Sequence, residues 1–519
     1  MKSGFLRSGE PFIWLTGGAL AACLIMIAGL VAVVAYYALG AFWPRDLLTY
    51  EVADSKVMGQ LWNEQPEVGR IQLKVGNRDV YGADFRWIDV TEDDIPTTHP
   101  DAVAFERREW GDYYGFVEGV YDGDQLVSEG AGAWEALQER INKAHELYAR
   151  IKGLETGELE ELDQQIQALK LEQRVNPAPA IDRELDETWQ KYEQLSASVS
   201  QMREEMNYSE VAVATVDGKT SRIKTGDIVS SHRPNQLGVG GKTAVYLGRM
   251  WEFVSDEPRE SNTEGGVFPA IFGTVMMVFL MSLAGVPFGI LAALYLREYA
   301  KQGPLVRAIR IAVNNLAGVP SIVFGMFGLG FFVYGVGGSI DQLFYPERLP
   351  APTYGTGGIL WASLTLALLT VPVMIVSAEE ALASVTREVR EGSLALGATK
   401  VQTILRVVLP GALPGILTGV ILVIARGAGE VAPLMITGVV KLAPSLPLDG
   451  VFPFLHLERK FMHLGFHIYD VGFQSPNVEA ARPMVYTTTL LLMAIVLLLN
   501  LAAIVFRSRV RKRLTGSAV

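Results

Sequence analysis

Two opposite charges interrupt one of the most apolar stretches of the chain. Arg426 and Glu430 are the only charged residues between Val407 and Val440. Insertion scales put the cost of one ionised side chain at the centre of a membrane span at about 2.5–3.5 kcal/mol, so such residues are functional candidates. Their i, i+4 spacing predicts that both side chains lie on one helical face and form an ion pair. A tetrahedral oxyanion would compete with the Glu430 carboxylate for the planar guanidinium of Arg426. The alternative is a structural ion pair that holds this helix against a partner subunit.

A second segment combines a short helix, a glycine stop and a Leu-Pro pair. It reads Glu391-Gly392-Ser393-Leu394-Ala395-Leu396-Gly397, followed after nine residues by Val407-Val408-Leu409-Pro410. Glycine adopts the left-handed conformation without strain, so the helix is expected to end at Gly397 and to present a knob. The alternative is an ordinary amphipathic connector, which does not require this spacing.

The elements that must position these residues divide into a charged part and an apolar part. Of 519 residues, 50% are apolar and 19% are charged, with 45 Lys and Arg against 56 Asp and Glu. Residues 45–264 hold 24 of the basic and 43 of the acidic side chains, a net charge of −19, and the rest of the chain has a net charge of +8. This division excludes a single soluble domain, a disordered chain and a basic nucleic-acid-binding protein.

The apolar part contains six runs long enough to cross a membrane, which takes about 20 residues. They predict helices near residues 12–40, 267–296, 311–336, 357–378, 413–438 and 484–506. Lys and Arg are in excess in every second connecting segment, including Lys2 and Arg7 before the first span and Arg507 to Arg513 after the last. By the positive-inside rule, both termini are expected in the cytoplasm and residues 45–264 on the outer side.

The acidic part is expected to form one mixed α+β domain with a protruding helical hairpin. Apolar and polar residues alternate around Gly76-Asn77 within residues 70–90, and the runs 211–216 and 223–229 flank Asp217-Gly218, so both pairs predict β-hairpins. Between residues 134 and 206 the apolar spacing is helical and is broken at 176–180, which predicts two antiparallel helices. The acidity indicates a solvated surface, with a docking face for a basic partner as the alternative.

Three other patterns are weaker. Val239-Gly240-Gly241-Lys242-Thr243 lacks the first glycine of a phosphate-binding loop, because position 236 is Gln, so no nucleotide site is predicted. His456, His463 and His467 lie in one outer loop, and an interfacial surface of histidine and aromatic residues is favoured over a metal site. Leu20-Ala21-Ala22-Cys23 is similar to a lipoprotein cleavage site, but the long apolar run after it favours a retained signal anchor. The lone Cys23 also excludes a disulfide framework and a cysteine-based zinc site.

The segment from Glu391 to Pro410 resembles the signature of binding-protein-dependent ABC importer permeases: Glu-Ala-Ala, three residues, Gly, nine residues, Ile-x-Leu-Pro. Gly392, Ser393 and Val407 depart from that consensus. In that family the knob docks into a cleft of the ATPase subunit. The resemblance therefore implies an ATPase-coupling role for Glu391, Gly397, Leu409 and Pro410.

Residues 267–506 resemble phosphate permeases of the PstA type, and the acidic domain with Asp256–Glu260 resembles the N-terminally extended members. The runs that carry this resemblance are Asn315–Gly325, Glu379–Leu382 and Ala425–Leu434. In those permeases the positions of Arg426 and Glu430 are thought to line the anion path. They often have an Arg three residues before Glu-Glu-Ala-Leu, where this chain has Val376, so a second cationic contact is missing or is supplied elsewhere.

The expected fold is an α-helical polytopic membrane protein with six transmembrane helices, similar to type I ABC importer permeases, and an inserted α+β extracytoplasmic domain. Its parts are residues 1–44, with the N-terminus and first span, the acidic periplasmic domain 45–264, and a five-helix permease core 265–519 with the coupling segment 379–412. The resemblance implies a non-enzymatic permease subunit of a phosphate importer in the bacterial inner membrane. The alternatives are a permease for another oxyanion, such as molybdate or sulfate, and a membrane signalling scaffold with a ligand-sensing domain.

The resemblance also implies the partners. ATP and Mg would bind an ATPase subunit dimer, and this chain would bind no cofactor and no metal. The other expected partners are a second, homologous permease subunit (PstC-like), a periplasmic phosphate-binding protein and membrane lipid. No nucleic acid is expected.

Overall fold

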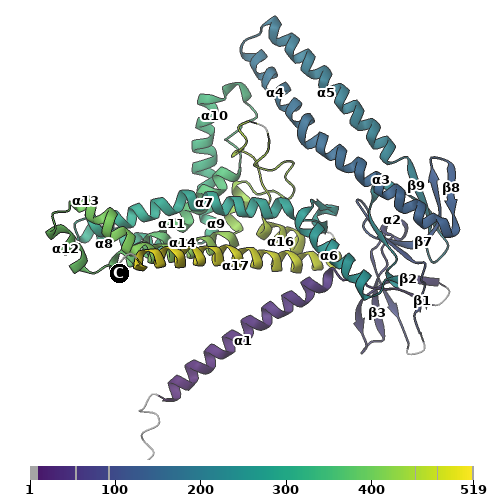
Figure 1. Cartoon of the computed structure of the whole chain (residues 1–519), viewed down its shortest axis with the longest axis horizontal. Coiled ribbons are helices and arrows are strands. Elements are labelled where there is room, and N and C mark those ends of the chain that lie inside the picture. Colours follow the sequence, from purple (N-terminus) through teal and green to yellow (C-terminus); the bar gives the residue numbers. More distant parts are fainter. Residues whose placement is uncertain (1–9, 53–54, 92–93, 451, 476, 517–519) are drawn as a thin grey trace, which may run out of the picture.

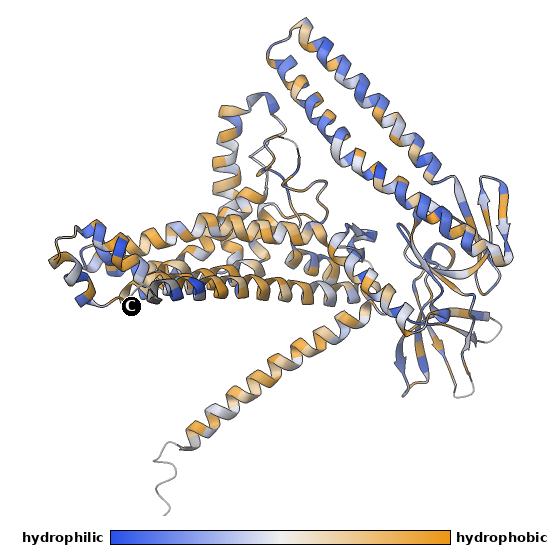
Figure 2. Cartoon of the chain, in the orientation of Figure 1, coloured by the Kyte–Doolittle hydropathy of each residue, from blue (hydrophilic) through white to orange (hydrophobic). Residues whose placement is uncertain are grey.

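The chain forms a bundle of apolar helices with a strand-rich domain at one end, as the computed structural model in Figure 1 shows. The structure describes residues 10–52, 55–91, 94–450, 452–475 and 477–516. Lys2 and Arg7, on which the orientation prediction partly rests, lie outside these residues. Figure 2 separates the two parts by hydropathy, because the bundle is apolar along its length and the strand-rich domain is mixed.

Within the described residues, six helical stretches are long and apolar enough to cross a membrane. They are Phe12–Ala41, Phe268–Tyr299, Ser321–Phe344, Ile359–Ser384, Lys400–Gly429 and Val478–Lys512. The first, second, fourth and sixth agree with the predicted spans to within a few residues, except that the fourth extends to Ser384 and the sixth begins at Val478 and extends to Lys512. The helices that form these stretches are α1 (Glu10–Ala41), α7 (Phe268–Leu294), α9 (Ser321–Phe327), α10 (Gly338–Phe344), α11 (Ile359–Ser384), α14 (Leu409–Gly429) and α17 (Val478–Gly516).

The predicted third span, 311–336, begins ten residues too early. Its first residues belong to a separate amphipathic helix, α8 (Pro304–Leu316). The chain is non-helical at Gly318 and Val319, and α9 begins after Pro320. Proline disfavours the helical conformation of the residue before it, and glycine weakens a helix, so this Gly-Val-Pro sequence separates the two helices.

The predicted fifth span, 413–438, is wrong as a single helix. α14 ends at Gly429, Glu430 has an extended backbone (φ −80°, ψ 130°), and a short helix α15 (Ala432–Thr437) follows. A helix that continued through this point would place the Pro433 ring against the carbonyl of Gly429, four residues earlier. Pro433 therefore disfavours a continuous helix at this point, although α7, α11, α14 and α17 each continue through an internal proline.

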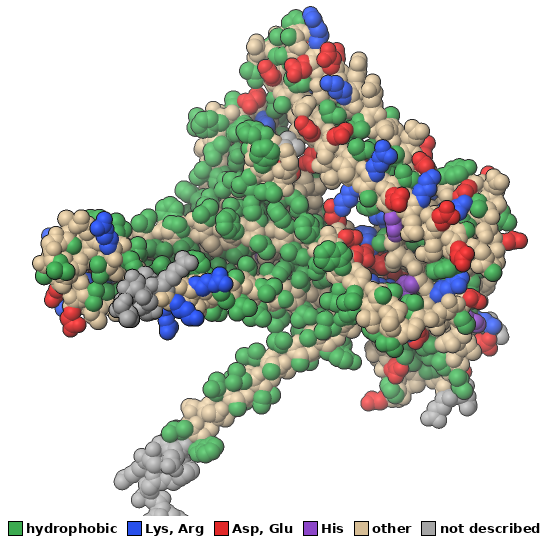
Figure 3. Space-filling view, in the orientation of Figure 1, with side chains coloured by type: hydrophobic (Ala, Val, Ile, Leu, Met, Phe, Trp, Pro, Cys, Tyr) green, Lys and Arg blue, Asp and Glu red, His purple; other side chains and the backbone are tan. Residues whose placement is uncertain are grey.

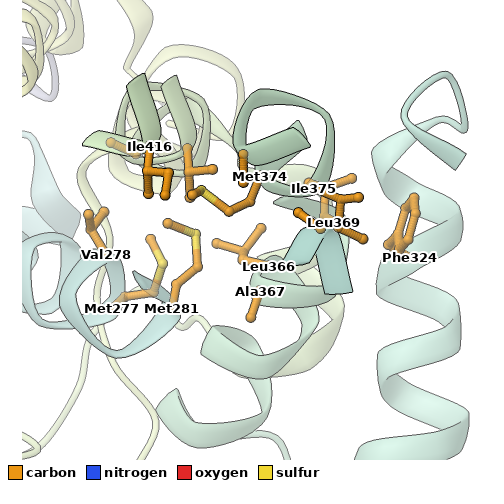
Figure 4. Close-up of a cluster of buried hydrophobic side chains, with 14 of the residues drawn as sticks. Met277, Val278, Met281, Phe324, Leu366, Ala367, Leu369, Met374, Ile375 and Ile416 are labelled. Atoms are coloured by element: carbon orange, nitrogen blue, oxygen red, sulfur yellow. The ribbon is translucent and has the colours of Figure 1, made fainter. Parts of the chain in front are cut away.

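The core of the bundle lies around α11, which packs between α7 and α14. Figure 4 shows the buried side chains that these helices and α9 contribute, among them Met277, Met281, Phe324, Leu366 and Met374. The helices approach closely, because a Cβ atom added at Gly289 of α7 would lie 2.5 Å from Met374 Cγ of α11. Small residues permit this backbone approach in membrane bundles.

The strand-rich domain lies between α1 and α7 in the sequence and contains two antiparallel sheets and a two-stranded ribbon close to the start of α7. One sheet has the order β4-β3-β2-β1-β5, and the other has the order β10-β9-β7-β6-β11 with β8 paired to β7. The strands are β1 (Leu47–Val52), β2 (Ser55–Gln65), β3 (Arg70–Lys74), β4 (Phe85–Asp89), β5 (Thr97–Thr98), β6 (Val103–Arg107), β7 (Tyr113–Asp122), β8 (Gln125–Glu129), β9 (Ser209–Ala214), β10 (Thr220–Lys224), β11 (Ile228–His232), β12 (Pro258–Arg259) and β13 (Glu264–Gly265).

Both predicted β-hairpins are present, with changes at their ends. β3 pairs with β4, but a short helix, α2 (Arg78–Tyr81), joins them in place of a tight turn at Gly76-Asn77. β9 pairs with β10 around Asp217-Gly218, as predicted. The predicted strand 223–229 is divided, because a turn at Thr225–Asp227 ends β10 and the following β11 pairs with β6.

The predicted helical hairpin projects from this domain. α3 (Ala133–Leu154) continues through a π-helical turn into α4 (Glu160–Val175), and α5 (Pro179–Met206) returns antiparallel to both. Apolar residues at helical spacing line the inside of the hairpin, including Ile141, Ile151, Ile166 and Val199. Its contact with the bundle includes an ion pair between Arg459 and Glu160 at 3.4 Å.

α6 (Val239–Ser255) leads from the domain toward α7, and α16 (Leu464–Phe473) precedes α17 and packs against it. The Gly-Gly-Lys-Thr sequence lies at the start of α6, where Lys242 Nζ is 2.7 Å from Asp46 Oδ1. The loop histidines are not an interfacial surface, because His456, His463 and His467 are all buried. Burial lowers the pKa of His463 and of His467 to about 4, so both are neutral.

The basic connecting segments gather at the end of the bundle that lies opposite the strand-rich domain. α12 (Arg387–Ala395), α13 (Lys400–Thr403) and the C-terminal end of α17 lie there together (Figure 1). Figure 3 shows Lys and Arg side chains at this end of the molecule. The fold thus brings together basic residues that are far apart in the sequence.

Candidate functional site

Arg426 and Glu430 meet where α14 stops. Arg426 lies in the last turn of α14, and Glu430 is the first residue after it. Arg426 Nε and Glu430 Oε1 are 3.6 Å apart, and both side chains are partly exposed. This separation is that of an ion pair without a close hydrogen bond. The pairing was predicted from one continuous helix, whereas the structure brings the two side chains together across a helix end.

The helix break is packed against α9. A Cβ atom added at Gly325 of α9 would lie 2.8 Å from Pro433 Cα of α15. Phe324 and Leu434, from the same two helices, are buried in the core of the bundle. The ends of two runs that are separate in the sequence, Phe324–Gly325 and Pro433–Leu434, therefore pack together close to the helix break.

A second cation of the bundle is held much more tightly than Arg426. Arg310 of α8 contacts Glu379 of α11 with Nη2 at 2.9 Å and Nε at 3.1 Å from the same carboxylate oxygen, and its Nη1 donates to Gln302 Oε1 at 2.9 Å. This arrangement satisfies the guanidinium, so Arg310 has few donors left for an anion. Among these two arginines, Arg426 is the one available to a ligand.

The Arg310–Glu379 pair also lies close to Val376, the residue that stands where an arginine was expected. Val376 is partly buried on α11, one helical turn before Glu379. The structure therefore has a cation one turn away from Val376, and α8 supplies it. No local sequence pattern indicates this pair, because its members are 69 residues apart and the first lies in a helix that was not predicted.

The coupling segment forms the expected knob. α12 ends at Ala395, and Gly397 has φ +86°, the left-handed conformation of a helix stop. Leu396 beside it is 91% exposed, and Thr399 with Gln402 forms a capping box that begins α13. Glu391 is exposed on α12.

Leu409 and Pro410 lie away from the knob, in the first turn of α14. A π-helical turn at Ile404–Val408 precedes them, and the backbone N–H of Leu409 donates to the carbonyl of Ile404. Leu409 packs against the buried core of the bundle. The four residues of the motif therefore lie in two parts of the structure. Glu391 and Gly397 are in the knob, and Leu409 and Pro410 are at the start of α14, the helix that carries Arg426.

Comparison with known proteins matches this half of the chain. Residues 285–515 match the family described as binding-protein-dependent transport system inner membrane component. A probable phosphate transport system permease protein PstA of Methanocaldococcus jannaschii is 33% identical over 221 residues, which are 42% of this chain and 67% of that protein. The chain belongs to this family of permeases.

Two further named relatives agree with this assignment. A probable ABC transporter permease protein YqgI of Bacillus subtilis is 30% identical over 51% of this permease and 86% of its own length. The phosphate transport system permease protein PstA 1 of Mycobacterium tuberculosis is 34% identical over 47% of this permease and 71% of its own length. A solved structure of the MetNI methionine ABC transporter aligns with a TM-score of 0.33 and 22% identity, over 47% of this permease and 94% of that chain. The permease is a multi-pass inner membrane protein and a transport subunit.

The knob of the permease is tied to the end of α7. Arg390 of α12 lies 3.0 Å from Glu298, and its Nη2 also donates to the carbonyl of Leu382 at the end of α11. Both charged side chains are mostly buried. These contacts connect the knob to two helices of the bundle. The sequence analysis missed this pair, since the two residues are 92 positions apart.

The junction between the bundle and the strand-rich domain holds a cluster of buried charges that the sequence analysis also missed. Lys74 Nζ lies 2.6 Å from Asp112 Oδ2, which lowers the pKa of Asp112 to about 2, against the opposing effect of burial. Burial raises the pKa of Glu264 to about 8, and the nearby charge of Asp112 adds to this. Glu264 lies three residues before Val267, which precedes α7, so this carboxyl is located in the connection between the domain and the second span.

Proposed function

We propose that this permease is a transmembrane subunit of an ATP-driven importer of inorganic phosphate. The observation that carries the proposal is the position of Arg426: a partly exposed guanidinium at a helix break, held by one loose contact with Glu430. Phosphate offers tetrahedral oxygens that fit the donors of a guanidinium, and it would replace Glu430 as the partner of Arg426. Relatives named as phosphate permeases support this choice of anion.

The remaining parts of the importer are separate chains in this proposal. An ATPase dimer, with ATP and Mg, engages the knob at Glu391 and Gly397, and its closure is transmitted through Arg390 and Glu298 to α7. A second permease subunit (PstC-like) completes the pathway beside Arg426. A periplasmic phosphate-binding protein delivers the anion at the opposite end of the bundle, with both termini of this chain in the cytoplasm and the strand-rich domain outside.

In this mechanism the Arg426–Glu430 ion pair keeps the guanidinium neutralised until the anion binds. With the pathway empty, Glu430 neutralises Arg426 and lowers the cost of a cation within the membrane. When phosphate arrives, the guanidinium exchanges the carboxylate for the anion, so Arg426 has an anionic partner both before and after the exchange. The helix break allows this exchange because Glu430 is not fixed within the hydrogen-bonded part of α14.

The proposal is tested by purifying the permease with the subunits that co-assemble and measuring ATPase activity in liposomes with the binding protein. Phosphate is expected to stimulate ATP hydrolysis, and sulfate and molybdate are expected to leave the basal rate unchanged. Stimulation by sulfate or molybdate without an effect of phosphate would reassign the substrate. Ligand binding by the strand-rich domain, together with transport that persists after its deletion, would support the signalling alternative instead.

A further inference from the structure

A cavity lies where the first and last spans meet the strand-rich domain. α1 leaves the bundle at an angle, so that it and α17 form a V whose apex lies beside the domain (Figure 1). At the apex the rings of Tyr37 and Tyr486 stack with centroids 5.0 Å apart. The cavity beside them has a volume of about 580 Å³ and is lined by both helices and by β2 and β3. This is within the range of about 300–1,000 Å³ that small-molecule sites occupy.

The position of the cavity corresponds to the headgroup level of a bilayer. Its lining residues come from the end of α1 and the start of α17, on the side where both spans reach the strand-rich domain. Four of its aromatic side chains are Tyr36, Trp43, Trp62 and Tyr486. Tyr and Trp concentrate at the membrane–water interface, where the ring is in an apolar environment and the polar atom reaches water.

Two arginines give this cavity the charge of an anion site. Arg45 stacks on Trp62, with its guanidinium carbon 4.9 Å from the ring centroid, and its Nη1 donates to the carbonyl of Leu61 at 2.5 Å. Arg482 is exposed, and no described side chain forms an ion pair with it. The one carboxylate in the lining, Glu479, accepts a hydrogen bond from Gln72. The side chains around the cavity therefore have a net charge of +1, and Arg482 has all its donors free.

The helices that leave the apex are suited to acyl chains. None of the residues in the most apolar windows of α1 and α17 is buried within the chain. Figure 3 shows hydrophobic side chains along the whole of α1. A free anion would contact only the arginines, whereas a phospholipid would contact the arginines, the aromatic side chains of the lining and the apolar helix faces together.

We propose that this cavity binds the phosphate headgroup of an anionic phospholipid, whose acyl chains lie along α1 and α17. Arg45 and Arg482 donate to the phosphate oxygens, and Trp43 and Tyr36 cover the glycerol region. The lipid links the first span, the last span and the strand-rich domain, which meet at this point. The arrangement is independent of the transported anion, because the cavity and Arg426 lie at different helices.

Lipid retention measured by native mass spectrometry tests this assignment. The full permease, with its co-assembling subunits, is placed in nanodiscs of phosphatidylcholine with a minor fraction of phosphatidylglycerol. The complex is then released from the nanodiscs, and the phosphatidylglycerol molecules that remain bound to it are counted. Arg482→Gln is expected to weaken retention about tenfold, the effect of losing a charge-assisted hydrogen bond. Arg482 is exposed and unpaired among the described side chains, so this variant is expected to fold.

The matched control is Arg174→Gln, which removes an exposed charge from α4, on the helical hairpin. It is expected to leave retention unchanged, and Arg482→Lys is expected to restore part of it. Equal retention in Arg482→Gln and the parent would overturn the proposal. Displacement of the lipid by excess inorganic phosphate would also overturn it, as would crosslinking that places a partner subunit in the cavity.

Discussion

The ion pair at the helix break can be tested by neutralising its two members singly and together. Arg426→Gln removes the cation, Glu430→Gln removes its competitor, and the double variant replaces the pair with two neutral amides of similar shape. In our account only the cation stabilises the passing anion. Arg426→Gln and the double variant are therefore expected to slow transport, whereas Glu430→Gln is expected to keep the rate of the parent.

The magnitude follows from the distance between the two charges. Unit charges 3.6 Å apart attract by about 1 kcal/mol at the dielectric constant of water and by about 5 kcal/mol at an effective constant of 20. Both side chains are partly exposed, so solvent screening favours the lower part of this range, about 1–2 kcal/mol. A phosphate at the same distance gains a similar amount from Arg426. Its loss corresponds to a decrease of about 5- to 30-fold in the transport rate.

The assay is uptake of radiolabelled phosphate into proteoliposomes that contain the co-purified complex, the binding protein and internal ATP. Co-purification of the other subunits and the basal ATPase rate verify assembly for each variant. Arg426→Lys, which keeps the charge without the planar fork, is expected to be intermediate.

A structural ion pair gives the opposite pattern. Either single substitution would then leave one uncompensated charge and impair assembly, and the double variant would restore both assembly and transport. Recovery of uptake in the double variant would therefore refute the role of Arg426 as the anion contact.

Three further predictions concern the knob and the junction. Gly397→Ala forces a side chain into the left-handed region, at a cost of about 1–2 kcal/mol, and is expected to reduce phosphate-stimulated ATPase activity. The control Gly392→Ala adds a Cβ atom that meets no atom within 4 Å and is expected to have no effect. Equal ATPase activities of the two variants would contradict the knob geometry. Arg390→Gln is expected to lower uptake about tenfold while ATP hydrolysis persists, because it removes the contact with Glu298; unchanged coupling between hydrolysis and uptake would exclude this route. Because the folded-state pKa of Glu264 is raised to about 8, its contribution to stability is complete below about pH 4.5 and is lost as the pH rises through 8. The melting temperature of the permease is therefore expected to fall between pH 5 and 9 by more than that of Glu264→Gln, and parallel curves would contradict the assignment.

Much of the fold follows from local sequence patterns. Long uncharged runs identified six spans because a bilayer requires a minimum apolar length, and the helical hairpin and both β-hairpins were visible in the spacing of apolar residues. The predicted spans 311–336 and 413–438 were wrong because each uncharged run was taken as one continuous helix. Pro320 and Pro433 mark the two breaks, and both were present in the sequence as signals that a hydrophobicity count does not weigh.

The candidate site was predicted only where its partners are close in the sequence. Arg426 and Glu430 are four positions apart, and the knob at Gly397 depends on its neighbours. The pairs of Arg310 with Glu379 and of Arg390 with Glu298 join residues 69 and 92 positions apart, so no local pattern indicates them. The same reason applies to the buried charges at the junction, which come from separate strands and from the connection to α7.

The most direct test of the central claim is anion competition in the reconstituted importer. Uptake of radiolabelled phosphate is measured with ATP inside the liposomes and with excess unlabelled phosphate, sulfate or molybdate outside. The account predicts ATP-dependent accumulation that unlabelled phosphate abolishes and the other two anions leave unchanged, and accumulation that decreases in Arg426→Gln. ATP-dependent uptake of sulfate or molybdate, without uptake of phosphate, would contradict it.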